Sequence, residues 1–130
     1  MRLITTNFEF LKGKDDKLYS LGSEMESKVY MDPGSAIFKG NRLFETILDL
    51  TFEESCVPDL PNKSNYLDRI NKLYEFGVID YRAKDIFDSA RRERNKGIHG
   101  DESPRRALNL NKIIFKMVTW YFKKFIDFDF

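Results

Sequence analysis

The chain contains a single histidine, His99, which lies at the end of a basic run. Histidine is the one side chain whose unperturbed pKa lets it both donate and accept a proton near neutral pH. Arg94, five residues earlier, is a permanent cation whose planar fork fits a phosphate group, and the amide Asn95 follows it. The run Arg94-Asn95-Lys96-Gly97-Ile98-His99 is therefore the place in this sequence best suited to acid–base chemistry.

Two helix geometries would bring these groups together. If the helix continues to His99, Arg92 and Asn95 share its face, because they lie seven and four residues before it. If the helix ends near Gly97, a residue type that often ends helices, Arg94 can reach His99 instead. A purely structural interpretation stands beside both, because cations in a last helical turn complement the negative end of the helix dipole.

Caps and apolar spacing predict the helices that position this run. Asp32-Pro33 and Ser103-Pro104 each place proline at a first helical position after a capping side chain. Apolar residues recur at three- and four-residue steps, and no alternating β-branched stretch competes. The predicted helices run from about Asp15 to Met31, from Asp32 through Thr51, from Ser64 to Gly77, from Asp80 toward the basic run, and from Ser103 to about Phe125. The sequence thus predicts one all-α domain over residues 1–130, an antiparallel bundle of about five helices.

The last predicted helix is apolar around most of its circumference. Its one narrow polar face carries Lys112, Lys116, Thr119 and Lys123. Such a helix is buried on most sides. Two interpretations remain open: a central core helix, or a helix with one face packed on a second subunit or on a continuation of a longer chain.

The composition excludes several classes of protein. A net charge of +1 gives no overall attraction to nucleic acid or membrane. Cys56 is the only cysteine, so no intrachain disulfide can form, and we expect a buried or half-buried thiol. The sequence has neither a long apolar run nor a signal peptide, which predicts a soluble cytoplasmic protein without membrane contact.

Metal and cofactor sites find little support in the sequence. One histidine and one cysteine cannot form a zinc site of the usual type. Acidic residues at helical spacing allow two interpretations, a magnesium site or an ordinary solvated face; they are Glu45, Asp49, Glu53 and Glu54. Glu45 could pair with Arg42 or reach the basic run. We expect no metal and no cofactor.

The chain resembles the HEPN superfamily of small α-helical domains. Catalytic members carry an arginine, a polar residue, three variable residues and a histidine, which the run from Arg94 to His99 matches without a gap. The rest resembles the branch found at the N-terminus of type I restriction R subunits and as stand-alone proteins. The matching segments are Phe8-Glu9-Phe10-Leu11, the helix start Asp32-Pro33…Ala36, Arg42-Leu43-Phe44-Glu45 and Asn95-Lys96-Gly97-Ile98-His99-Gly100. That branch often has glycine at the position of Arg94 and carries its arginine at the position of Arg91. The resemblance therefore leaves open which of the two arginines would be catalytic.

The resemblance implies a metal-independent endoribonuclease of toxin or anti-phage defence type, acting as a homodimer. RNA would be cut by its own 2′-hydroxyl, with one His99 as base and the partner copy's as acid. The implied catalytic residues are Arg94, which holds the scissile phosphate, Asn95, which orients the imidazole, and His99. Arg91, Arg92 and Lys96 would contact flanking phosphates. An inhibitory or activating protein partner is expected, because free ribonuclease harms its host.

A second function follows from the same resemblance, because many members of this branch look non-catalytic. The chain would then be a HEPN module that dimerises, or docks a partner or nucleic acid, within a restriction or defence system.

Overall fold

The protein is an all-helical bundle in the computed structural model, which describes residues 6–96 and 102–130. A short 3-10 turn, η1 (Glu9–Leu11), precedes five α-helices in this part of the chain. They are α1 (Asp16–Ser27), α2 (Pro33–Ser55), α3 (Tyr66–Glu75), α4 (Tyr81–Lys96) and α5 (Pro104–Phe125). No strand occurs in either described range, so the predicted all-α class is confirmed.

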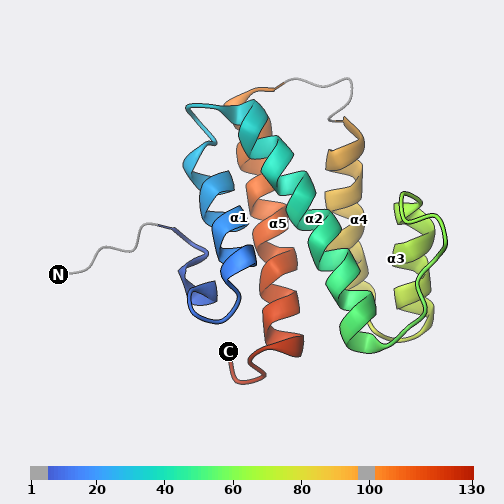
Figure 1. Cartoon of the computed structure of the whole chain (residues 1–130). Helices are drawn as coiled ribbons and strands as arrows, with labels where there is room; N and C mark the ends of the chain where they lie inside the picture. The colour runs from blue at the N-terminus through green and yellow to red at the C-terminus, as the bar shows by residue number, and fades with distance from the viewer. Residues whose placement is uncertain (1–5, 97–101) are drawn as a thin grey trace.

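The helix α5 occupies the centre of the bundle (Figure 1). It lies between α1 and α4, α2 crosses in front of it, and α3 packs on the outer side of α4. The helices α1 and α2 are antiparallel, and so are α3 and α4. By contrast, α2 and α5 run in the same direction. The reason is the connection over residues 56–65, which returns along the bundle before α3 begins.

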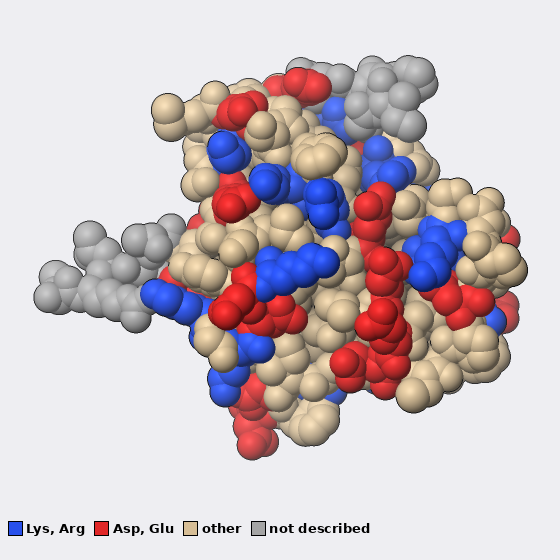
Figure 2. Space-filling model, in the orientation of Figure 1, with Lys and Arg blue, Asp and Glu red and all other residues tan. Residues whose placement is uncertain are grey.

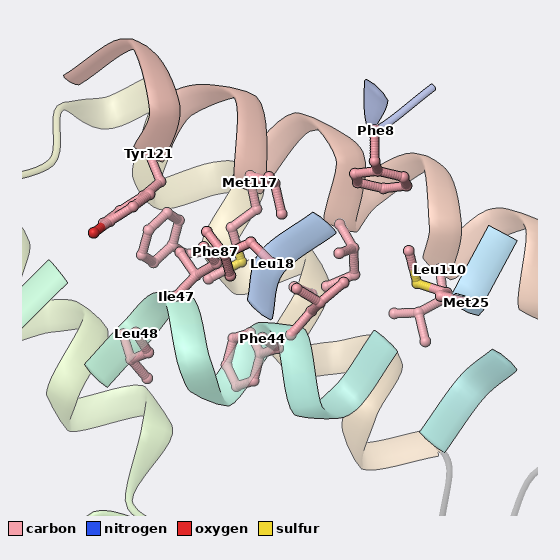
Figure 3. Close-up of a cluster of buried hydrophobic side chains, with 14 of the residues drawn as sticks. Phe8, Leu18, Met25, Phe44, Ile47, Leu48, Phe87, Leu110, Met117 and Tyr121 are labelled. Atoms are coloured by element: carbon pink, nitrogen blue, oxygen red, sulfur yellow. The ribbon is translucent and has the colours of Figure 1, made fainter. Parts of the chain in front are cut away.

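The core is formed by side chains from every layer. Figure 3 shows Phe8, Leu18, Phe44, Phe87 and Met117 converging between the helices, and each of these side chains is fully buried. Contacts of α5 with α1, α2 and α4 account for apolar residues on most of its circumference. These contacts agree with the first of the two interpretations of the last helix, a central core helix.

Local capping explains where the helices begin. Asp32 and Ser103 accept hydrogen bonds from the amides of Ser35 and Arg106, as their positions before proline predict. Asp80 Oδ1 accepts from the Ala83 amide at 2.8 Å, which confirms the predicted start of α4.

Three local expectations are wrong. Asn65 caps α3 instead of Ser64, whose hydroxyl donates to Asn62 Oδ1 at 2.6 Å. The first long helix ends at Ser27, and Met31, expected within it, is 92% exposed. Cys56, expected to be buried or half-buried, is exposed, and it ends α2 in a left-handed conformation with φ of 58°.

The segment before α1 is held against the bundle by aromatic rings. The rings of Phe8 and Phe10 meet Phe115 edge-on, with centroids 5.5 and 6.1 Å apart. Gly22 of α1 permits this approach, because a Cβ atom there would lie 2.6 Å from the Phe8 ring. None of the described helices combines the length and hydropathy needed to cross a membrane.

Candidate functional site

The C-terminal part of α4 carries five of the six residues that the sequence singles out. The remaining one, His99, lies outside the described residues, so neither of the two helix geometries considered for the basic run is tested. The structure places the other five on different faces of one helix. They are Arg91, Arg92, Arg94, Asn95 and Lys96.

Arg94 faces α2 and is bound within the chain. Its Nη2 lies 2.9 Å from Glu45 Oε1, and the two side chains are 28% and 39% exposed. The guanidinium also stacks over the Tyr66 ring, 4.7 Å from its centroid. Glu45 therefore reaches the basic run, as one of the two sequence-based interpretations has it, and α2, α3 and α4 meet at Arg94.

Tyr66 completes this contact. Its hydroxyl donates to the same Glu45 oxygen at 2.9 Å. Burial raises the pKa of Tyr66, and the hydrogen bond and the charge of Glu45 raise it further. The phenol thus stays protonated and keeps donating, so Glu45 accepts from a cation and a hydroxyl at once. Nothing in the sequence singles out Tyr66, because its role depends on how α3 packs on α4.

Arg91 and Asn95 lie one helical turn apart and line a small hollow of about 190 Å³. The start of α3 forms its other wall, with Ser64, Asn65, Tyr66 and Leu67. Arg91 Nε lies 3.4 Å from Asp88 Oδ1, a long contact that leaves the rest of its guanidinium fork available. The structure therefore brings an arginine and an amide together, but the arginine is Arg91 and not Arg94.

Lys96 and Arg92 lie away from that hollow. Lys96 pairs with Glu93 at 3.0 Å and lines a larger hollow of about 510 Å³ beside the start of α5. Arg92 is exposed and forms no ion pair with any described residue. The predicted phosphate contacts of Arg91, Arg92 and Lys96 are thus spread over separate surfaces.

A buried arginine that the sequence analysis missed organises the neighbouring region. Arg69 of α3 is 1% exposed, and its Nη2 lies 2.7 Å from Asp49 and 2.8 Å from Asp59. Its Nη1 donates to the Lys63 carbonyl at 2.9 Å. Burial alone lowers the pKa of Arg69, but the hydrogen bonds to Asp59 and Asp49 outweigh burial and raise it. Arg69 stays charged and fastens α3 and the 56–65 connection to α2.

Two of the four acidic residues of α2 are used in these contacts. Figure 2 shows acidic side chains gathered in a band over the C-terminal half of α2. Glu45 and Asp49 of α2 pair with Arg94 and Arg69. Within residues 6–96 and 102–130 no cluster of acidic, histidine or cysteine side chains has the geometry to hold a metal ion.

Comparison with known proteins links the chain to restriction systems. Over 127 residues, 96% of the chain, it is 24% identical to the type I restriction enzyme EcoKI endonuclease subunit of Escherichia coli (strain K12). The match spans 11% of the length of that subunit. No protein-family model and no solved structure matches the chain. The chain is thus similar to one segment of a much longer restriction subunit.

Proposed function

We propose that the chain is a HEPN-like helical module of a restriction or related defence system, acting by docking and without cutting RNA. Two findings support this proposal. One is the similarity to a segment of a restriction endonuclease subunit, and the other is the ion pair that Arg94 forms with Glu45. The contact between Arg94 and Glu45 is the single observation that carries it.

A catalytic Arg94 would have to leave this contact. In the ribonuclease mechanism its guanidinium must offset the charge that develops on the scissile phosphate. Glu45 already occupies the guanidinium at 2.9 Å, and its carboxylate would repel an incoming phosphate. Stacking on Tyr66 further fixes the side chain. These contacts favour a residue that joins helices over one that binds substrate.

Ribonuclease activity is the second candidate, and one observation favours it. Arg91 and Asn95 line the same hollow on the outer face of α4. The resembling branch carries its arginine at the position of Arg91. In this alternative Arg91 holds the phosphate, Asn95 orients the imidazole, and two copies of His99 complete the site across a homodimer axis.

RNA cleavage distinguishes the two candidates. The purified chain and the His99→Ala variant are incubated with end-labelled RNA in the presence of a metal chelator. We expect equal background cleavage by both proteins. Cleavage that requires His99 would overturn the docking proposal, and the variants Arg91→Gln and Arg94→Gln would then identify the working arginine.

Both candidate functions involve a homodimer, and the association of two copies is tested separately. Sedimentation of the purified chain across a range of concentrations measures it directly. We expect a homodimer, and a monomer at all concentrations would contradict this part of the proposal.

A further inference from the structure

The central helix α5 carries charge of one sign only. Its sequence contains six lysine and arginine residues and no aspartate or glutamate. Five of the six are exposed and form no ion pair within the described ranges. One of the five, Lys124, lies over the Trp120 ring, 5.8 Å from its centroid. We call the other four the α5 basic face: Arg105, Lys112, Lys116 and Lys123.

The four side chains point in one direction. At 100° per residue they fall within an arc of about 40° around the helix axis. The buried side chains Leu110, Ile114 and Met117 lie on the opposite side of α5, toward the core. From Arg105 to Lys123 the row is about 27 Å long, at a rise of about 1.5 Å per residue. The α5 basic face is thus a straight row of cations directed away from the bundle.

Two hollows along the seam between α4 and α5 extend this row. The hollow of about 510 Å³ near the start of α5 adds Lys96 and Arg106. A second hollow, of about 400 Å³ near the start of α4, adds Arg82. Only Glu93 and Asp80 are acidic among the residues that line the two hollows, and Glu93 is already paired with Lys96.

From this arrangement we propose that the α5 basic face and the adjoining seam bind the phosphate backbone of double-stranded DNA. A row of about 27 Å matches about eight base pairs, since phosphates recur about every 3.4 Å along each strand. Backbone contacts of this kind position a duplex without reading its sequence.

The aromatic rings of the seam favour a duplex over a single strand. Single-strand sites use free aromatic faces on which bases stack. Here Trp120 packs edge-on against Phe87, and Phe115 packs against Phe8 and Phe10. The seam therefore offers cations beside aromatic rings that are already packed against other rings of the chain. The choice of DNA over RNA rests on the proposed function in a restriction system.

Fluorescence anisotropy with a labelled DNA duplex of about 20 base pairs tests the proposal, at about 50 and 200 mM salt. The test variant combines Arg105→Gln, Lys112→Gln, Lys116→Gln and Lys123→Gln. A matched control combines Arg42→Gln, Lys14→Gln, Lys17→Gln and Lys63→Gln, which remove the same charge from exposed positions elsewhere. All eight side chains are exposed, so both variants are expected to fold.

We expect the test variant to bind at least tenfold more weakly and the control to bind within about threefold of the parent. The slope of log affinity against log salt concentration should fall in magnitude by about 3.6 in the test variant, because each of the four phosphate contacts contributes about 0.9. Trp120 is the only tryptophan in the chain and lines the seam, so unlabelled duplex should change the fluorescence of the parent but not of the test variant.

Several results would overturn the proposal. They are no duplex binding by the parent at low salt, an equal loss in the control, or equal or tighter binding of single-stranded DNA, duplex RNA or polyglutamate. The last outcome would indicate an acidic protein partner. RNA cleavage is measured separately, so failure of duplex binding would leave the proposed non-catalytic module untouched.

Discussion

Arg94 and Glu45 are 49 positions apart in the sequence, yet Arg94 Nη2 donates to Glu45 Oε1 at 2.9 Å. This contact joins α4 to α2, and Tyr66 of α3 adds a hydrogen bond to the same carboxylate oxygen. A residue with the spacing of a catalytic arginine thus serves as a junction of three helices. Arg91 and Asn95, also of the basic part of α4, line a separate hollow of about 190 Å³.

Loss of Arg69 should weaken the fold strongly. Arg69→Met removes a guanidinium that is 1% exposed and leaves Asp59, 18% exposed, without its partner. We expect the free energy of unfolding to fall by about 3 kcal/mol, as for other broken buried ion pairs. Urea unfolding followed by circular dichroism measures the change. Arg92→Met, at an exposed position, is the control, with an expected change within about 0.5 kcal/mol; equal effects would refute the structural role of Arg69.

The approach of Phe8 to α1 should not tolerate a side chain at Gly22. A Cβ there would lie 2.6 Å from the Phe8 ring, so Gly22→Val must displace the ring or the helix. We expect a loss of about 2 kcal/mol, typical of overpacked cores. Ser20→Val introduces the same residue at an exposed position of α1 and should change stability little. Similar melting temperatures for the two variants would show that Phe8 does not pack as described.

Stability should fall at alkaline pH because of Tyr121. Burial raises the pKa of Tyr121 to about 12, and the charge of Glu54 adds to this shift. The folded state thus holds this proton more tightly than the unfolded state, whose tyrosine titrates near pH 10. The stabilisation that the neutral phenol of Tyr121 contributes is therefore complete below about pH 10 and is lost as the pH rises toward 12.

The variant Tyr121→Phe isolates this effect. Between pH 8 and pH 11 the parent should lose about 1 kcal/mol more unfolding free energy than Tyr121→Phe. Urea unfolding at the two pH values measures the difference, and the other tyrosines contribute equally to both proteins. If the two proteins lose the same stability over this range, Tyr121 is not buried as described.

Local signals in the sequence account for most of the fold. Asp32, Asp80 and Ser103 cap helices through hydrogen bonds to amides three residues ahead, a relationship that sequence spacing alone contains. The apolar steps through Phe44 and Leu48 likewise predict the buried face of α2. Ser64 and Asn65 show the limit of such signals, because two adjacent capping residues compete and only the path of the loop decides between them.

The candidate site was less predictable because its contacts are long-range. Arg69 reaches Asp49, 20 positions earlier, and no spacing rule links the two. The basic run is visible in the sequence, but its division between a partly exposed ion pair at Arg94 and an open hollow at Arg91 depends on where α2 and α3 pack.

The central claim is that Glu45 holds Arg94 as a structural residue, and a double-mutant cycle tests it most directly. Unfolding free energies are measured for the parent, Glu45→Gln, Arg94→Met and the double variant. A parallel cycle pairs Glu45→Gln with Arg92→Met, which lies on the same helix without an ion-pair partner among the described residues. Because both side chains of the Arg94–Glu45 pair are partly exposed, the expected coupling is about 0.5 to 1 kcal/mol. The account predicts this coupling for Arg94 and none for Arg92; additive effects for Arg94 would contradict it and return the residue to the list of candidate phosphate ligands.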